Sequence, residues 1–326
     1  MSLSIDADCA LTYWMSSIAT TAMRQRASHE TLMERIDTGN LPDWAYAPDG
    51  LVHVVASNRQ GFINRSAVQC KVAPKALRRS SFVFTDNGLP VVSPECCFLR
   101  LSNVLSLHEL VKAGALLCSS FAFNESGCMT GRPEAITSAK KIANYIRSID
   151  GASGIKQARR ALRFIADNAA SPPEIDTCIL LCLPVMCGGY GCPLPELNGH
   201  IRLRPQVART LGYSNCYGDL LWRDAKCIVE YASEQFHTGY KKQSKDEMRR
   251  AALEAMGYRV FLLTRPQLYN QVAFEGFARP ILRLLGRRMP KRTLEYQAMQ
   301  YELRKSLLYE SSWTIERACH SYEREI

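Results

Sequence analysis

The order of apolar and polar positions predicts a β-sheet with a crossover helix between residues 218 and 264. Two short apolar segments, Asp219–Trp222 and Cys227–Tyr231, precede a polar segment with helical spacing over about 244–256, and a third apolar segment, Arg259–Thr264, follows. Apolar segments this short, bounded by turn residues, are typical of buried strands. The pattern therefore predicts a βα unit with a buried sheet.

The N-terminal part predicts a small β-rich unit with helices. Apolar residues at helical spacing from Ala7 to Leu32 predict a pair of short helices. Ser93, Pro94 and Glu95 mark the start of another helix, because a hydroxyl cap, an early proline and an acidic first turn favour helix N-termini. The other expected elements are strands over 51–56, 68–72, 81–85 and 89–92, a helix over 107–116, and an irregular loop over 124–135.

The C-terminal half predicts helices around the sheet. Helical spacing covers 137–149 and 156–168, and each segment has a basic face that suits solvation as well as nucleic-acid contact. The sequence Ser-Pro-Pro-Glu at 171–174 is another helix start. A strand is expected over 200–203, and further helices over 274–286 and 294–317.

Composition and charge limit the class of protein. The chain of 326 residues is too long for one ordinary core, so two domains are expected. The formal net charge of +10 favours a polyanionic partner such as nucleic acid, although many basic proteins bind none. The N-terminus does not resemble a secretory signal, and no apolar run approaches the roughly 20 residues of a spanning helix. We therefore expect a cytoplasmic protein with reduced thiols and no membrane association.

Carboxylates give the predicted sheet a candidate site. Asp219 and Glu230 lie on adjacent predicted strands, and Glu174 lies in the first turn of the preceding helix. Such oxygen ligands hold Mg²⁺, which orients water and neutralises charge in phosphodiester hydrolysis. His237 would act as a general base or stabilise charge. The alternative is structural, because carboxylates at strand ends are common and Glu174 also suits a helix dipole.

Zinc chemistry is a weaker alternative. Cys178, Cys182, Cys187 and Cys192 would be candidate ligands, but structural zinc sites present close pairs of ligands on turns. Cys178 and Cys182 lie within an apolar predicted helix, so buried free thiols are the better interpretation. The sequence also contains no P-loop and no Gly-x-Ser-x-Gly nucleophile elbow.

A basic segment follows the predicted sheet. Arg279, Arg283 and Arg287 recur every four positions, so one helix face would carry them. Such a row suits DNA or RNA because phosphate contacts release counterions. The alternative is a solubilising face on a packing helix. The candidate nucleic-acid-binding residues are Arg279, Arg283, Arg287, Arg288, Lys291 and Arg292.

Residues 171–268 resemble the Vsr-like (very-short-patch-repair-like) endonuclease domain of the PD-(D/E)XK nuclease superfamily. The resemblance implies a mixed-sheet restriction-endonuclease-like fold, DNA as substrate, and Mg²⁺ or Mn²⁺ held by Glu174, Asp219 and Glu230. The matching features are Ser-Pro-Pro-Glu at 171–174, Asp219-Leu-Leu-Trp, Val229-Glu230-Tyr231, His237, Asp246 with Arg249 and Leu253, and Gly257-Tyr258-Arg259-Val260.

Position 232 departs from that pattern. Relatives have an acidic residue two positions after the glutamate, and the wider superfamily has a lysine, where this chain has Ala232. An alanine neither ligates a metal nor polarises water, so either the site is naturally degraded or an active residue was replaced. The candidate catalytic residues are Glu174, Asp219, Glu230, Ala232 and His237.

The N-terminal part is similar, more loosely, to the C-terminal domain of AbiEi-type abortive-infection antitoxins. The similarity lies in Val52–Ala56, the basic segment Lys71–Arg79, and the sequence Gly88-Leu-Pro-Val-Val-Ser-Pro-Glu95. The winged-helix DNA-binding module of such antitoxins is not evident. This likeness implies a role in bacterial defence, with a cognate toxin or another defence protein as a partner.

Together these observations predict a two-domain α/β protein. Residues 1–130 would form an antitoxin-like α+β domain, 131–170 a helical connector, 171–270 the nuclease-like domain, and 271–326 basic and amphipathic helices. The first hypothesis is a Mg-dependent DNA endonuclease whose activity Ala232 weakens or abolishes. The alternatives are a non-catalytic DNA-binding or toxin-neutralising antitoxin or transcriptional regulator, and a protein-interaction module in phage defence.

Overall fold

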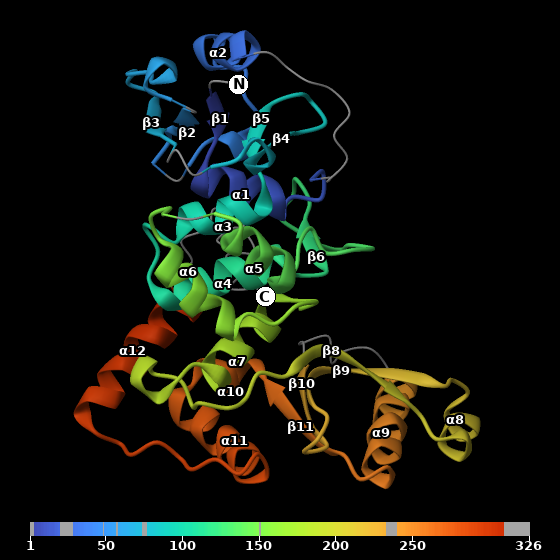
Figure 1. The fold of residues 1–326 in the computed structure, drawn as a ribbon. Helices are drawn as coiled ribbons and strands as arrows, with labels where there is room; N and C mark the ends of the chain where they lie inside the picture. The colour runs from blue at the N-terminus through green and yellow to red at the C-terminus, as the bar shows by residue number, and fades with distance from the viewer. Residues whose placement is uncertain are drawn as a thin grey trace. The chain divides into compact units, whose positions relative to one another are not determined.

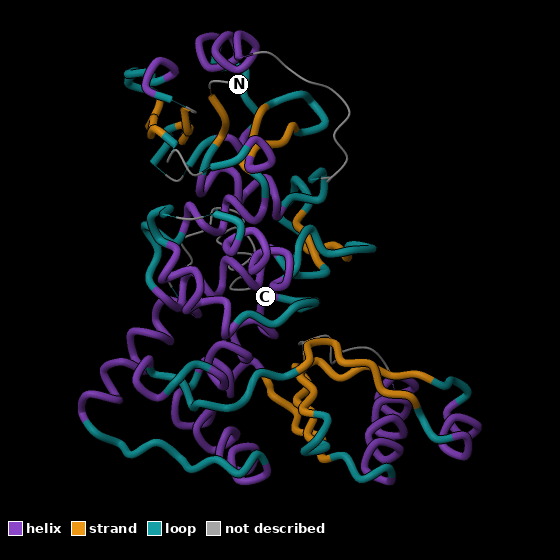
Figure 2. Tube along the Cα trace, viewed as in Figure 1, coloured by secondary structure: helices purple, strands orange, loops and turns teal. Residues whose placement is uncertain are grey.

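The chain divides into two compact units of mixed α/β structure, which Figures 1 and 2 show by element and by type. The computed structural model describes residues 3–19, 29–47, 49–56, 58–73, 77–149, 151–232 and 240–309. Unit 1 comprises residues 1–165 together with 310–326, and unit 2 comprises residues 166–309.

Unit 1 contains a five-stranded mixed sheet of strand order β3-β2-β1-β5-β4. Strand β1 is antiparallel to β2 and parallel to β5, β3 is parallel to β2, and β4 is antiparallel to β5. The four strands expected between 51 and 92 are confirmed, whereas β1 was not predicted. The strands are β1 (Leu3–Ile5), β2 (Val52–Ala56), β3 (Val68–Val72), β4 (Phe82–Phe84) and β5 (Pro90–Val92).

Helix α3 of unit 1 begins where its capping residues predict. The Ser93 hydroxyl accepts a hydrogen bond from the Cys96 amide, and Pro94 follows as the first helical residue. Helices α5 and α6, expected as a connector, belong to unit 1. The helices are α1 (Ala7–Met15), α2 (His29–Thr38), α3 (Pro94–Leu101), α4 (Leu107–Leu117), α5 (Ala139–Arg147) and α6 (Ile155–Ala161).

One expectation for unit 1 is wrong. The segment 124–135 is not a loop throughout, because strand β7 (Met129–Gly131) pairs antiparallel with β6 (Phe121–Phe123). Its strand-forming residues are few and lie among turn residues, so the sequence shows no period of two. Backbone pairing within the hairpin replaces the missing sequence signal.

Unit 2 contains a four-stranded sheet of order β11-β10-β9-β8. Strands β8, β9 and β10 form an antiparallel meander, and β11 returns parallel to β10 after the crossover helix α9. The predicted strand, helix and strand pattern from 218 to 264 is confirmed. The elements are α7 (Pro172–Cys182), β8 (Glu196–Arg202), α8 (Pro205–Leu211), β9 (Asn215–Trp222), β10 (Cys227–Ala232), α9 (Tyr240–Ala255), β11 (Arg259–Thr264), α10 (Arg265–Tyr269), α11 (Gln271–Leu284) and α12 (Leu294–Leu308).

Helix α9 covers one face of this sheet, as Figure 1 shows. Leu253 of α9 packs in a buried cluster with Leu221 of β9 and Ile228 of β10. Gly199 allows close packing, because a Cβ atom there would lie 2.6 Å from Leu221 Cδ2. This packing fixes which side chains of β9 and β10 point toward α9.

The C-terminal helices differ from expectation at their ends. Helix α11 ends at Leu284, and Gly286 follows with a φ of +65° that interrupts helical geometry. Arg287 therefore lies outside the helix, so Arg279, Arg283 and Arg287 do not form one continuous helical row. Helix α12 ends at Leu308, and the expected continuation beyond 309 lies outside the described residues. None of the helices in the described ranges is long and apolar enough to cross a membrane.

Candidate functional site

Glu174 lies in the first turn of α7, where three donors hold its carboxylate. Its Oε1 accepts a hydrogen bond from Ser171 Oγ at 2.8 Å, and its Oε2 accepts from the Ala170 amide at 2.8 Å and from Asn198 Nδ2 at 2.9 Å. The residue is 6% exposed. Asn198 also donates to the Asn168 carbonyl, so β8 and the chain before α7 together fix this carboxylate.

Asp219 lies in β9, and its Oδ2 accepts a hydrogen bond from the backbone amide of Tyr231 at 2.8 Å. This bond joins the side chain to the neighbouring strand β10. Burial raises the pKa of Asp219, while the Tyr231 amide and the positive charge of Arg249 oppose that rise. Asp219 is therefore a half-buried carboxylate with one fixed oxygen.

Glu174 and Asp219 form an electrostatically coupled pair. Burial first, and the negative charge of Asp219 second, raise the pKa of Glu174 to about 7, against the three hydrogen bonds that lower it. Two carboxylates at one site resist ionising together, because each raises the free energy of the other's charged form. The pair therefore favours a proton or a cation at neutral pH. We call Glu174 and Asp219 the acidic pair.

Glu230 has a different partner. Arg249 of α9 binds it through two hydrogen bonds, from Nη1 to Oε2 at 3.1 Å and from Nη2 to Oε1 at 3.0 Å. The side chains of Glu230 and Arg249 are 15% and 29% exposed. Arg249 Nη2 also donates to the Tyr217 carbonyl. The charge of Glu230 is thus neutralised by a bidentate guanidinium within the fold.

Different groups act on Glu230 and on the acidic pair. Arg249 binds Glu230 at two points, whereas the negative charge of Asp219 acts on Glu174. Burial raises the pKa of Asp219, and the positive charge of Arg249 opposes that rise. Among the residues with described placement, no group of three or more His, Cys, Asp and Glu side chains is arranged to hold a metal ion. The expected set of Glu174, Asp219 and Glu230 is not brought around one point.

The remaining candidate catalytic positions add little to the acidic pair. Ala232 is the last residue of β10 and pairs with Thr264 of β11. Alternation places its methyl group on the face of Glu230, where it offers no ligand atom. His237 lies outside the described residues.

The six candidate cations near α11 divide into two groups. Arg279 and Arg292 both pair with Glu275, at 3.3 Å and 2.6 Å between Nη2 and the carboxylate oxygens. Glu275 precedes the basic segment and compensates part of its charge. The other four cations are exposed: Arg283, Arg287, Arg288 and Lys291.

The acidic pair fits Mg²⁺ or Mn²⁺ through its donor set. Hard divalent cations take carboxylate oxygens, and Mg²⁺ commonly uses one or two of them with water completing its shell. A cation at the acidic pair would also relieve the repulsion between Glu174 and Asp219. Glu230 does not fit this role, because Arg249 already compensates its charge.

Two residues of this site were missed or undervalued from the sequence. Asn198 carries no motif, and its role depends on how β8 lies beside α7. Arg249 was noted as part of a family pattern and not as the partner of Glu230. A signal existed, because Arg249 lies four residues before the buried Leu253 and so shares its inward helix face. Comparisons with protein-family models, curated proteins and solved structures gave no match.

Proposed function

We propose that unit 2 is a nuclease-like domain that acts on DNA. In this proposal Glu174 and Asp219 would hold Mg²⁺ or Mn²⁺, and Ala232 weakens or abolishes cleavage. The observation that carries the proposal is the acidic pair, in which burial and then the negative charge of Asp219 raise the pKa of Glu174 to about 7. Strongly perturbed carboxylates of this kind concentrate at functional sites.

The order of elements supports the proposal at the level of the fold. Helix α7, strand β8, helix α8, strands β9 and β10, helix α9 and strand β11 follow each other in unit 2. This mixed α/β arrangement with a mixed sheet is compatible with the fold that the resemblance to PD-(D/E)XK nucleases implies. Asp219 and Glu230 lie on the adjacent strands β9 and β10, as expected from the sequence.

The chain's own residues would divide the chemistry between them. A bound divalent ion supplies charge neutralisation and an activated water. Asp219 offers an oxygen while Tyr231 holds the carboxylate in place. Glu174 exchanges its proton near neutral pH, so it would release a proton when a cation arrives and recover it when the cation leaves. Ala232 contributes neither a ligand nor a general base.

Exposed aromatic groups on the sheet suit a nucleic-acid strand. Tyr217 is 55% exposed on β9, and its ring centroid lies 5.5 Å from that of His200 on β8. Aromatic rings of this kind stack with bases, and the net charge of +10 favours the phosphates.

Plasmid cleavage tests the proposal. The full-length protein and its Ala232→Asp and Ala232→Lys variants are incubated with supercoiled plasmid and Mg²⁺ or Mn²⁺. We expect weak or no nicking by the original chain and a gain with one of the variants, which Asp219→Asn then removes. Ala251→Asp, on the exposed surface of α9, is the matched control. Folded variants that all fail to nick DNA would exclude the enzymatic part of the proposal.

A non-catalytic DNA-binding or toxin-neutralising regulator is a second candidate. The observation that favours it is the Glu230–Arg249 pair together with Ala232, because both leave the β10 side of the site without a free acidic ligand. Gel shifts over a salt series distinguish the two candidates. A regulator binds DNA with steep salt dependence and cuts with no variant, while a toxin-neutralising protein co-purifies with its toxin and binds DNA weakly.

A further inference from the structure

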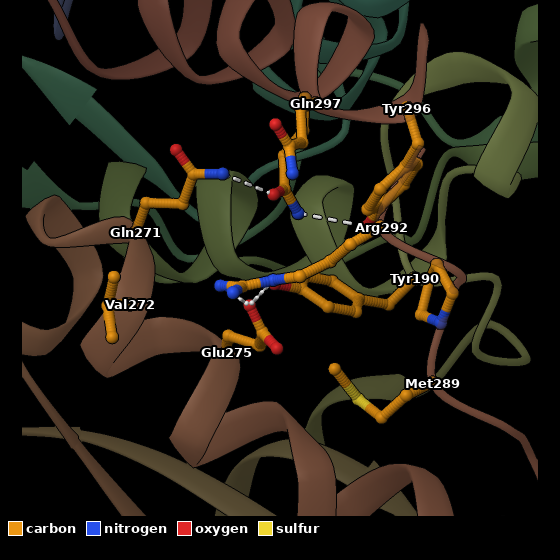
Figure 3. A pocket seen from close by; sticks show the side chains of 10 residues that line it. Tyr190, Gln271, Val272, Glu275, Met289, Arg292, Tyr296 and Gln297 are labelled. Carbon is orange, nitrogen blue, oxygen red and sulfur yellow. Dashed lines mark hydrogen bonds and ion pairs between the residues drawn. The ribbon is translucent and has the colours of Figure 1, made fainter. Parts of the chain in front are cut away.

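A pocket of about 280 Å³ lies in unit 2, and neither residue of the acidic pair lines it (Figure 3). Its walls come from the start of α11, the segment before α12, the first turns of α12, and the segment that follows α7. The volume lies just below the range of about 300–1,000 Å³ that is typical of small-molecule pockets. A single small ring compound fits this size, whereas a polymer would enter with one residue at most.

The floor of the pocket is polar, buried and fixed. Tyr190, Tyr296 and Gln300 are 3%, 6% and 3% exposed. Gln271 Nε2 donates to Gln300 Oε1 at 2.7 Å, and Gln300 Nε2 donates to the Tyr296 hydroxyl at 2.9 Å. Figure 3 shows this chain of hydrogen bonds as dashed lines. Because the amide of Gln271 donates into the floor, its carbonyl oxygen is left as an acceptor.

The rim carries a second amide and apolar groups. Gln297 is exposed at the rim, and Val272 is 70% exposed on the opposite wall. Met289 and Pro290 complete the apolar surface. An amide presents a donor and an acceptor side by side in one plane, which matches the edge of a nucleobase, while apolar groups cover its face.

Two exposed cations flank the pocket in sequence. Arg292 lines the pocket and reaches toward Glu275, as Figure 3 shows, and the Nη2 to Oε2 distance is 2.6 Å. Arg288 precedes the lining residue Met289, and Lys291 lies between the lining residues Pro290 and Arg292. Because Glu275 compensates Arg292, Arg288 and Lys291 are the cations left for an anion such as a phosphate group.

We propose that this pocket binds a nucleoside monophosphate unit, with its base between the glutamine amides and its phosphate at Arg288 and Lys291. The unit is either a free mononucleotide or one unpaired nucleotide of a strand. The binding needs no metal and no cleavage, so it stands apart from the proposed nuclease activity.

Titration calorimetry of the full-length protein in EDTA tests the site. The probes are the four deoxynucleoside 5′-monophosphates, the matching nucleosides, inorganic phosphate, and a 5′-phosphorylated single-stranded oligonucleotide. We expect Gln297→Leu to weaken binding by roughly 5- to 150-fold, the worth of a bidentate base contact. Lys291→Gln should reduce the salt dependence of binding. Gln206→Leu, an exposed glutamine on α8, is the matched control.

The two sources of the ligand give different results. Binding of a free monophosphate that Gln297→Leu weakens identifies a mononucleotide site. An effect of Gln297→Leu on the oligonucleotide alone identifies a site for one base of a strand. Equal binding of every probe by Gln297→Leu and Gln206→Leu, or no binding of any probe, would overturn the proposal. A failure of plasmid cleavage leaves each of these results unchanged.

Discussion

The acidic pair and the Glu230–Arg249 pair treat buried carboxylates in opposite ways. Burial first, and the negative charge of Asp219 second, raise the pKa of Glu174 to about 7. Glu230 lies on the next strand and is bound at two points by Arg249. Both arrangements belong to one small sheet. In the acidic pair, the repulsion between two carboxylates remains, and a bound cation can reduce it. In the Glu230–Arg249 pair, the guanidinium already neutralises the carboxylate.

This difference shows that the position of a carboxylate in the sequence motif does not decide whether it serves as a ligand or as part of an ion pair. Asp219 and Glu230 lie on adjacent strands and suit the same motif. The neighbouring charged group decides the role of each carboxylate. Glu230 meets the cation Arg249 and forms a structural ion pair, whereas Asp219 acts on another carboxylate, Glu174, and is a candidate ligand. The predictions below change one partner at a time to test that separation.

The largest effect is expected from Arg249→Met. Removing the guanidinium leaves Glu230 charged and partly buried, which we expect to lower the opening free energy of β9 and β10 by about 2–4 kcal/mol. Hydrogen exchange of the backbone amides of β9 and β10 measures it locally. Arg250→Met is the control, because Arg250 pairs with Glu254 on the exposed face of α9. Equal effects of both variants would show that the Glu230–Arg249 pair is not special.

Adding Glu230→Gln to Arg249→Met should restore part of that loss. The double variant has no unpaired charge, so most of the penalty should disappear. The same hydrogen-exchange measurement gives the coupling between the two positions. A double variant as unstable as Arg249→Met would indicate that the bond from Arg249 to the Tyr217 carbonyl matters more.

A smaller effect of opposite sign is expected from Glu174→Gln. The folded pKa of Glu174, about 7, lies above its ordinary value of 4.5, so its favourable contribution is present below pH 4.5 and is lost as pH rises through 7. Glutamine removes this dependence and can keep the three hydrogen-bonding partners. We expect a gain of roughly 1–3 kcal/mol in unit 2 at pH 8 and little change at pH 4.

A pH series of hydrogen exchange or unfolding measurements checks this sign. Glu196→Gln is the control, because the hydrogen bond from Arg223 lowers the pKa of Glu196. Its stabilising contribution is lost as pH falls, in the opposite direction. If the stability of unit 2 depends on pH equally in Glu174→Gln and in the original chain, the raised pKa that we assign to Glu174 is contradicted.

The smallest effect is expected from Arg223→Met. Arg223 and Glu196 form an ion pair at 2.5 Å, but their side chains are 46% and 53% exposed. Exposed pairs contribute about 0–1 kcal/mol, since water already solvates both charges. Thermal unfolding of unit 2 should therefore change little. A loss as large as that of Arg249→Met would contradict the role that we give to burial.

Local patterns in the sequence were sufficient for most elements. The strand, helix and strand pattern around β10, α9 and β11 follows from apolar periods and turn residues, and the starts of α3 and α7 follow from Ser, Pro and Glu. Strands β1, β6 and β7 were missed; β4 and β5 are equally short, but the Asp86-Asn87-Gly88 turn between them marked their position. The continuous row of arginines failed because Gly286 ends the helical geometry before Arg287.

The sequence by itself determined which carboxylates are candidates, since residue type and strand membership can be read locally. The tertiary structure decided which of these carboxylates form a structural ion pair and which remain candidate ligands. Helix α9 brings Arg249 to Glu230, and strand β8 brings Asn198 to Glu174. The negative charge of Asp219 acts on Glu174. Charge interactions depend on distance and burial, which arise from the packing of segments far apart in the chain, and no local pattern records them.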